Sequence, residues 1–108
     1  MATFDDFLKL EISAGTIVSV EAVPETDKLL KLTVNFGEEA NRTVVSGIRM
    51  YFPEFEVLVG TQALFVTNLE PRTIKEIESQ AMILGADADG EYVLLRPERV
   101  VPNGARVR

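Results

Sequence analysis

Apolar and polar residues alternate without interruption over residues 30–36. The apolar positions are Leu30, Leu32, Val34 and Phe36. A period of two is typical of a β-strand with one buried face. Turn-forming residues precede this strand at Pro24–Asp27 and follow it at Gly37–Asn41, and strand-like runs lie beyond them at Glu11–Val23 and Arg42–Ile48. The order of strands and turns predicts a three-stranded antiparallel meander.

The first of these strands contains a glycine, Gly15. A glycine inside a strand often marks a β-bulge, which allows a small sheet to bend into a barrel. Beyond it, the period of two places Val18, Val20 and Ala22 on the inner face.

The second half of the chain predicts two further barrel strands and a charged loop. Thr61–Thr67 is a β-rich run that should end before Pro71, and the apolar run Ala81–Ala86 is typical of a strand covered on both faces. Residues 68–80 between them form the predicted loop. Asp89-Gly90 predicts a hairpin turn before the fifth strand, Glu91–Leu95.

Short helices complete the prediction. Thr3 and Asp6 have the spacing of a capping box, so we expect a helix over Thr3–Lys9 that either plugs an open end of the barrel or contacts a second subunit. Pro53 favours a short helix within Tyr51–Gly60, and Arg96–Arg108 should be an extended tail with one turn. The fold class is all-β: a five-stranded OB-fold barrel with a short N-terminal helix and a short helix between strands 3 and 4. The side chains expected to be buried are Val18, Val20, Leu30, Leu32, Val34, Val45, Phe65, Ile83 and Leu94.

Composition limits the possible functions. The 108 residues suit one domain, and the absence of cysteine and histidine gives no reason to expect a disulfide, a metal site, a cofactor or catalysis. No apolar run reaches the roughly 20 residues of a membrane helix, so we expect a cytoplasmic protein without a membrane partner. The net charge of −6 opposes nucleic-acid binding in general, although local placement of charge matters more than the sum.

Four basic residues cluster in the meander: Lys28, Lys31, Arg42 and Arg49. They could form a nucleic-acid-binding face of a barrel, or they could be solvated charges neutralised by Glu38 and Glu39.

Several blocks of the sequence resemble one known family. These blocks are Asn68–Arg72 (NLEPR), Ile77–Met82 (IESQAM), Glu11–Val18 (EISAGTIV), Asp27–Leu32 (DKLLKL) with Val34–Gly37 (VNFG), and Arg42–Ile48 (RTVVSGI). Their order and content resemble the tRNA-binding domain family, which includes free-standing tRNA-binding proteins, C-terminal domains of methionyl-tRNA synthetases and an export-chaperone branch.

The resemblance implies a non-catalytic, homodimeric tRNA-binding module that recognises RNA by shape and backbone, with an aminoacyl-tRNA synthetase as a further candidate partner. The residues it implies for RNA binding are Lys28, Arg49, Asn68, Arg72, Lys75, Ser79 and Met82. The cations would meet phosphates, Asn68 and Ser79 would form hydrogen bonds, and Met82 would make an apolar contact. Residues 1–10 and 96–108 would form the dimer through Phe4, Phe7, Val100, Val101 and Val107.

The sequence departs from the family pattern at three places. Glu70 replaces a residue that is usually basic, and Glu76 and Ala81 replace glycines. Two added carboxylates should repel phosphates. A second function therefore stays open, that of a dimeric protein-interaction module such as an export chaperone or a synthetase docking subunit.

Overall fold

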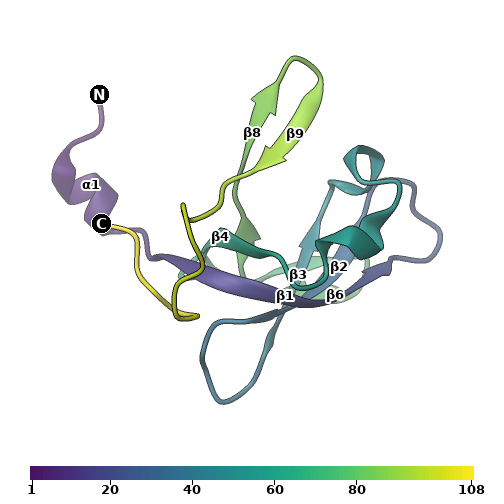
Figure 1. Cartoon of the computed structure of the whole chain (residues 1–108), viewed down its shortest axis with the longest axis horizontal. Coiled ribbons are helices and arrows are strands. Elements are labelled where there is room, and N and C mark those ends of the chain that lie inside the picture. Colours follow the sequence, from purple (N-terminus) through teal and green to yellow (C-terminus); the bar gives the residue numbers. More distant parts are fainter.

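The chain forms a nearly closed barrel built on one antiparallel sheet of five strands (Figure 1). The computed structural model describes all residues, 1–108. Its strands and helices are α1 (Phe4–Leu8), β1 (Ile12–Ala22), β2 (Leu30–Asn35), β3 (Arg42–Ser46), the 3-10 helices η1 (Arg49–Tyr51) and η2 (Phe55–Leu58), β4 (Gln62–Val66), β5 (Arg72–Ile74), β6 (Ile77–Ser79), β7 (Met82–Ile83), β8 (Gly85–Ala88) and β9 (Glu91–Leu94). The sheet order is β3-β2-β1-β4-β7. The predicted all-β barrel, the meander and both short helical segments are confirmed, although the segment between β3 and β4 forms 3-10 helices.

The core lies inside this barrel. Its largest fully buried side chains are Phe65, Ile17, Leu30, Leu32, Val34 and Val44. The rings of Phe36 and Phe65 meet edge to face, with centroids 5.1 Å apart. Of the side chains predicted to be buried, Leu30, Leu32, Val34, Val45, Phe65 and Ile83 are buried, and Val20 and Leu94 are half-buried against the core.

The prediction for Val18 is wrong, because a β-bulge lies at this residue. Ile17 pairs with Val34 in β2 and Ser19 pairs with the next residue, Thr33, so Val18 has no partner. Its side chain is 45% exposed, and Ile17 takes the inner position instead. Gly15 is not the bulge. It allows close packing, since a Cβ there would lie 2.6 Å from a ring carbon of Phe36.

The charged loop predicted for residues 68–80 contains a small hairpin. Strands β5 and β6 pair from Arg72↔Ser79 to Ile74↔Ile77. The two turn residues, Lys75 and Glu76, have φ of 50° and 66°, the left-handed conformation required by tight hairpin turns. Local pairing across this turn explains why a charged segment still forms strands.

The predicted strands Ala81–Ala86 and Glu91–Leu95 also differ from the structure. The first is interrupted at Leu84 and is not covered on both faces, since Met82 and Ala86 are exposed. β7 is the fifth barrel strand, whereas β9 pairs with β8 in a separate hairpin around the predicted Asp89-Gly90 turn. This hairpin projects from the barrel in Figure 1.

The two terminal segments lie beside each other at one end of the molecule (Figure 1). The capping box of α1 is present, with the Thr3 and Asp6 side chains each accepting a hydrogen bond from the other residue's backbone N–H. No α1 residue is buried, so the helix does not plug the barrel. The tail is extended with a turn at 103–104, as predicted, and Ala105 O and Val107 N form hydrogen bonds to β1. Neither α1 nor any other helix is long and apolar enough to cross a membrane.

Candidate nucleic-acid interface

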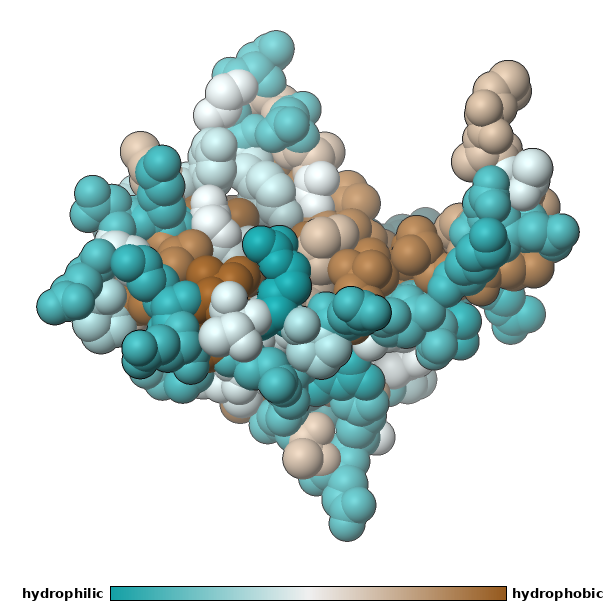
Figure 2. All heavy atoms as spheres, turned by 180° about the vertical axis from the view of Figure 1, so that it is seen from behind, coloured by the Kyte–Doolittle hydropathy of each residue, from teal (hydrophilic) through white to brown (hydrophobic).

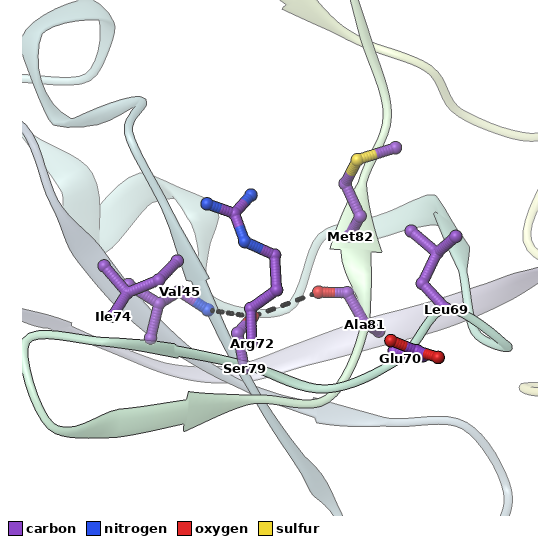
Figure 3. A pocket seen from close by; sticks show the side chains of 8 residues that line it. All are labelled: Val45, Leu69, Glu70, Arg72, Ile74, Ser79, Ala81 and Met82. Carbon is purple, nitrogen blue, oxygen red and sulfur yellow. Dashed lines mark hydrogen bonds between the residues drawn. The ribbon is translucent and has the colours of Figure 1, made fainter.

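A small pocket opens on the barrel surface between the β5–β6 hairpin, β3 and β7 (Figure 3). Its volume is about 100 Å³, and its lining residues are Val45, Leu69, Glu70, Arg72, Ile74, Ser79, Ala81 and Met82. Five of the eight are hydrophobic. The pocket therefore combines an apolar lining with one carboxylate, one guanidinium and one hydroxyl, and three of its residues, Arg72, Ser79 and Met82, are among the predicted RNA-binding residues.

Ser79 links the strands that close the barrel. Its buried Oγ accepts a hydrogen bond from Val45 N at 2.9 Å and donates one to Ala81 O at 3.1 Å. The only proton of the hydroxyl is thus used within the chain. Ser79 ends β6 and Met82 begins β7, so the break in regular strand at residues 80–81 lets both residues line one pocket.

Sequence reasoning missed the role of Gln80 beside it. Gln80 N donates to Thr43 O and Gln80 Oε1 accepts from Thr43 N, both at 2.8 Å. These two bonds continue the link from β3 to the 79–81 segment. Gln80 did fall within a block that resembled the family, but a polar side chain in a charged stretch gave no signal of its contact with a strand 37 residues away.

The guanidinium of Arg42 is bound within the chain and is not free for a ligand. Its guanidinium donates to both carboxylate oxygens of Glu38, at 2.8 and 2.7 Å, and to Thr67 O and Gln80 O at 2.7 and 3.2 Å. The hydrogen bonds from Arg42 lower the pKa of Glu38 below its usual value, and those to Glu38 raise the pKa of Arg42. Arg42 is therefore a charge neutralised by Glu38, the second of the two interpretations of the basic cluster.

Arg72 and Lys75 remain available for a ligand. Both are exposed, and neither takes part in any of the ion pairs of the structure. Lys75 occupies the tip of the β5–β6 turn next to Glu76, and Arg72 lies at the pocket with Glu70. The surface therefore presents two cations and three carboxylates, those of Glu70, Glu76 and Glu78, that form no ion pair.

Lys28 and Arg49 lie together but do not line this pocket. Arg49 N donates to Lys28 O at 3.1 Å, and Arg49 Nη1 donates to Thr26 O at 2.8 Å, which fixes the arginine beside the β1–β2 loop. Lys28 is exposed. The predicted RNA-binding residues thus form two groups.

Asn68 connects the start of β1 with the end of β4. Its Oδ1 accepts from Glu11 N and its Nδ2 donates to Lys9 O, each at 2.8 Å. One N–H and one acceptor position of the amide remain for a ligand.

The predicted dimer residues differ in exposure. Phe4 and Val100 are 72% and 82% exposed, whereas Phe7, Val101 and Val107 are half-buried. Val101 is held by the buried Gln62, whose amide donates to Val101 O at 2.7 Å and accepts from Val101 N at 3.0 Å. Apolar atoms interrupt the polar surface across the middle of the face seen in Figure 2 and continue toward the N-terminal segment.

A further part of the apolar surface lies outside the predicted dimer residues. Met50, Tyr51, Val57 and Val93 are each at least 46% exposed, and Tyr51 stacks on Tyr92 with ring centroids 5.8 Å apart. The unusually apolar composition of residues 51–60 was the available signal.

Comparisons with known proteins agree with this architecture. The family model described as "Putative tRNA binding domain" matches residues 12–106. Methionine–tRNA ligase of Deinococcus radiodurans is 47% identical over 109 residues, which cover 100% of this chain and 16% of the ligase. The chain spans only 15–16% of the length of the curated relatives from D. radiodurans and Porphyromonas gingivalis.

Two solved structures match over nearly their whole length. A MetRS related protein from Pyrococcus horikoshii is 38% identical with a TM-score of 0.91, covering 100% of this chain and 98% of that one. Chaperone CsaA from Bacillus anthracis is 31% identical with a TM-score of 0.88, covering 100% and 99%. The chain therefore belongs to the tRNA binding domain family, and it is related both to a part of methionine–tRNA ligases and to the chaperone CsaA.

Proposed function

We propose that residues 1–108 act as one tRNA-binding domain, without catalytic activity of its own, and that two copies form the working unit. The family match over residues 12–106 is the observation that carries this proposal. The pocket beside β5–β6 supports it, because it places a free guanidinium and an exposed methionine over an apolar lining. An aminoacyl-tRNA synthetase acting on the same tRNA is the further candidate partner.

RNA would be recognised mainly by shape and backbone. Arg72 and Lys75 on the hairpin contact phosphates, and Lys28 with Arg49 provides a second contact along the surface. Met82 packs against an unstacked base, while Asn68 and Ser79 use their remaining hydrogen-bonding positions. Glu70 and Glu76 weaken the phosphate contacts by repulsion, so we expect moderate affinity that falls steeply with salt.

The first experiment measures binding of bulk tRNA by gel shift at low and moderate salt. In Arg72→Ala/Lys75→Ala, affinity should fall and the slope of log affinity against log salt should decrease by about 0.7–0.9 per lost phosphate contact. The matched control is Arg99→Ala/Arg108→Ala, which removes two exposed cations from the tail. Equal losses in both variants would show that only net charge matters and would refute this surface.

The reverse change tests the carboxylates. Glu70→Lys/Glu76→Gly should tighten tRNA binding, because it removes two negative charges beside the phosphate contacts and adds one positive charge. Asp87→Lys/Asp89→Gly makes the same charge change on the β8–β9 hairpin. If tRNA affinity rises equally in both variants, the hairpin β5–β6 is not the binding surface.

Dimerisation rests on α1 and the tail. A helix of five residues is marginal in water, yet α1 buries none of its own residues. A second copy that covers Phe4, Phe7 and the exposed Val100 would supply the missing surface. Sedimentation at micromolar concentration should give twice the 12.0 kDa chain mass, and Phe4→Asp/Val100→Asp should give the chain mass. A wild-type chain that sediments as a monomer would refute the dimer.

A dimeric protein-interaction module is the second candidate function. Two observations favour it: the similarity to chaperone CsaA over the whole chain, and the free carboxylates beside the pocket. Saturable binding of an unfolded polypeptide, together with no tRNA binding at low salt, would favour this function over the first.

A further inference from the structure

Glu70 gives the pocket a chemistry that phosphate binding alone does not explain. The side chains that line it offer one carboxylate, one guanidinium and the Ser79 hydroxyl. Glu70 and Arg72 are both exposed, and they form no ion pair with each other or with any other residue. In Figure 3 they lie on opposite sides of Ala81. Each charge is therefore free to meet a different part of one ligand.

The hydrogen-bonding character of these groups limits that ligand. An ionised carboxylate can only accept hydrogen bonds, and Ser79 has given its one proton to Ala81 O. Arg72 is thus the only side-chain donor that lines the pocket. A complementary ligand carries hydrogen-bond donors toward Glu70, an anion toward Arg72 and an apolar face toward Met82 and Leu69.

A nucleotide joins these three features in one unit. With a volume of about 100 Å³, the pocket has room for part of one planar base and not for a helix. Among the four bases of RNA, guanine presents two adjacent donors, N1–H and the 2-amino group, which match the two oxygens of a carboxylate. Adenine and cytosine place an acceptor nitrogen beside their single amino group, and that acceptor would repel Glu70.

We propose that this pocket binds one unpaired guanine of RNA, with the Glu70 carboxylate accepting hydrogen bonds from its Watson–Crick edge and Arg72 contacting a neighbouring phosphate. This inference rests on the proposed RNA-binding function. The Watson–Crick edge is free only in a single-stranded loop or end, where base recognition in RNA is concentrated. Glu70 then acts as a specificity-determining residue: it lowers affinity for phosphate in general and selects for one base.

The test uses fluorescein-labelled heptamers of uridine that carry guanosine, inosine or adenosine at the central position, with binding followed by fluorescence anisotropy at low salt. Inosine differs from guanosine only by the missing 2-amino group. The wild-type protein should bind the guanosine heptamer more tightly than either of the others by about five-fold or more, the lower end of what a bidentate pair contributes to base discrimination.

Two variants locate the effect. Glu70→Gln should abolish the preference for guanosine over inosine, because an amide has one acceptor oxygen and places a donor beside it. Glu76→Gln removes the same charge from the tip of the hairpin, outside the pocket, and should keep the preference.

Equal affinity of the wild-type protein for the three heptamers would overturn the guanine site, as would an equal loss of preference in the two variants. If tRNA still binds in that case, the proposed function stands and only this inference fails. If neither tRNA nor any heptamer binds at low salt, both fail.

Discussion

Replacing Ser79 with alanine removes both hydrogen bonds through which its hydroxyl joins β3 to the segment before β7. The N–H of Val45, a residue only 6% exposed, loses its acceptor, and the carbonyl of Ala81 loses a donor. An unsatisfied buried group costs about 1–3 kcal/mol, and a lost neutral hydrogen bond about 0.5–1.5 kcal/mol. Because the pocket is open on one side, a water molecule can supply part of the lost hydrogen bonding. We therefore expect the free energy of unfolding to fall by about 2 kcal/mol.

Urea denaturation followed by circular dichroism measures this loss. Ser46→Ala is the control, since Ser46 is a half-buried serine of β3 whose side chain makes none of the bonds that close the barrel. The control should change stability by less than about 0.5 kcal/mol. If Ser79→Ala is as stable as Ser46→Ala, these side-chain bonds do not hold the barrel closed.

Two further predictions concern packing and pH. Gly15→Ala places a Cβ 2.6 Å from a ring carbon of Phe36 and should cost about 1–3 kcal/mol by overpacking, whereas Gly47→Ala, whose Cβ would find its nearest neighbour at 4.0 Å, should cost far less. Thermal unfolding of the two variants checks this, and equal melting temperatures would contradict the close-packing role of Gly15. Because Arg42 lowers the pKa of Glu38, their ion pair stabilises the fold above the usual pKa of a glutamate and loses that effect as the pH falls through the lowered value. Glu38→Gln should therefore lower the melting temperature at about pH 7 and lower it progressively less as the pH falls below the usual pKa of a glutamate; a difference in melting temperature between wild type and variant that does not change with pH would count against the ion pair.

The meander was predictable because its signal is local. Alternation along residues 30–36 defines which side chains face inward without reference to any other strand, and Leu30, Leu32 and Val34 are all fully buried. The helix cap at Thr3 was equally local, since its two partners lie three residues apart. The fold class could therefore be predicted from patterns that involve only neighbouring residues.

The errors arose where pairing overrides the local pattern. Alternation extended back from Ala22 and Val20 would place Val18 inside, but the bulge between Ile17 and Ser19 shifts the register by one residue, and only the partner strand reveals it. The β5–β6 hairpin was hidden because its short strands lie in a segment rich in charged residues. Likewise, the apolar run 81–86 did not reveal where the chain leaves the sheet.

The candidate site was only partly predictable. Resemblance to the family selected Arg72, Ser79 and Met82, which the structure brings together at one pocket. It did not select Leu69 or Ile74, the apolar residues of a charged stretch that complete the lining. Nor could the residue types show that Ser79 bonds to Val45, 34 positions away, because such contacts depend on barrel closure.

The tail after β9 has a consequence for how the protein is made. Residues 104–107 occupy the edge of β1 that β2 leaves free, and Asn103 bonds to Thr16 across 87 positions of sequence. Synthesis proceeds from the N-terminus, so the first half of β1 gains this neighbour only after residue 107 has left the ribosome. Until then the nascent barrel exposes unpaired backbone groups that can pair with another chain. A chain truncated before residue 104 would therefore have an almost complete barrel whose open β1 edge makes it prone to aggregate.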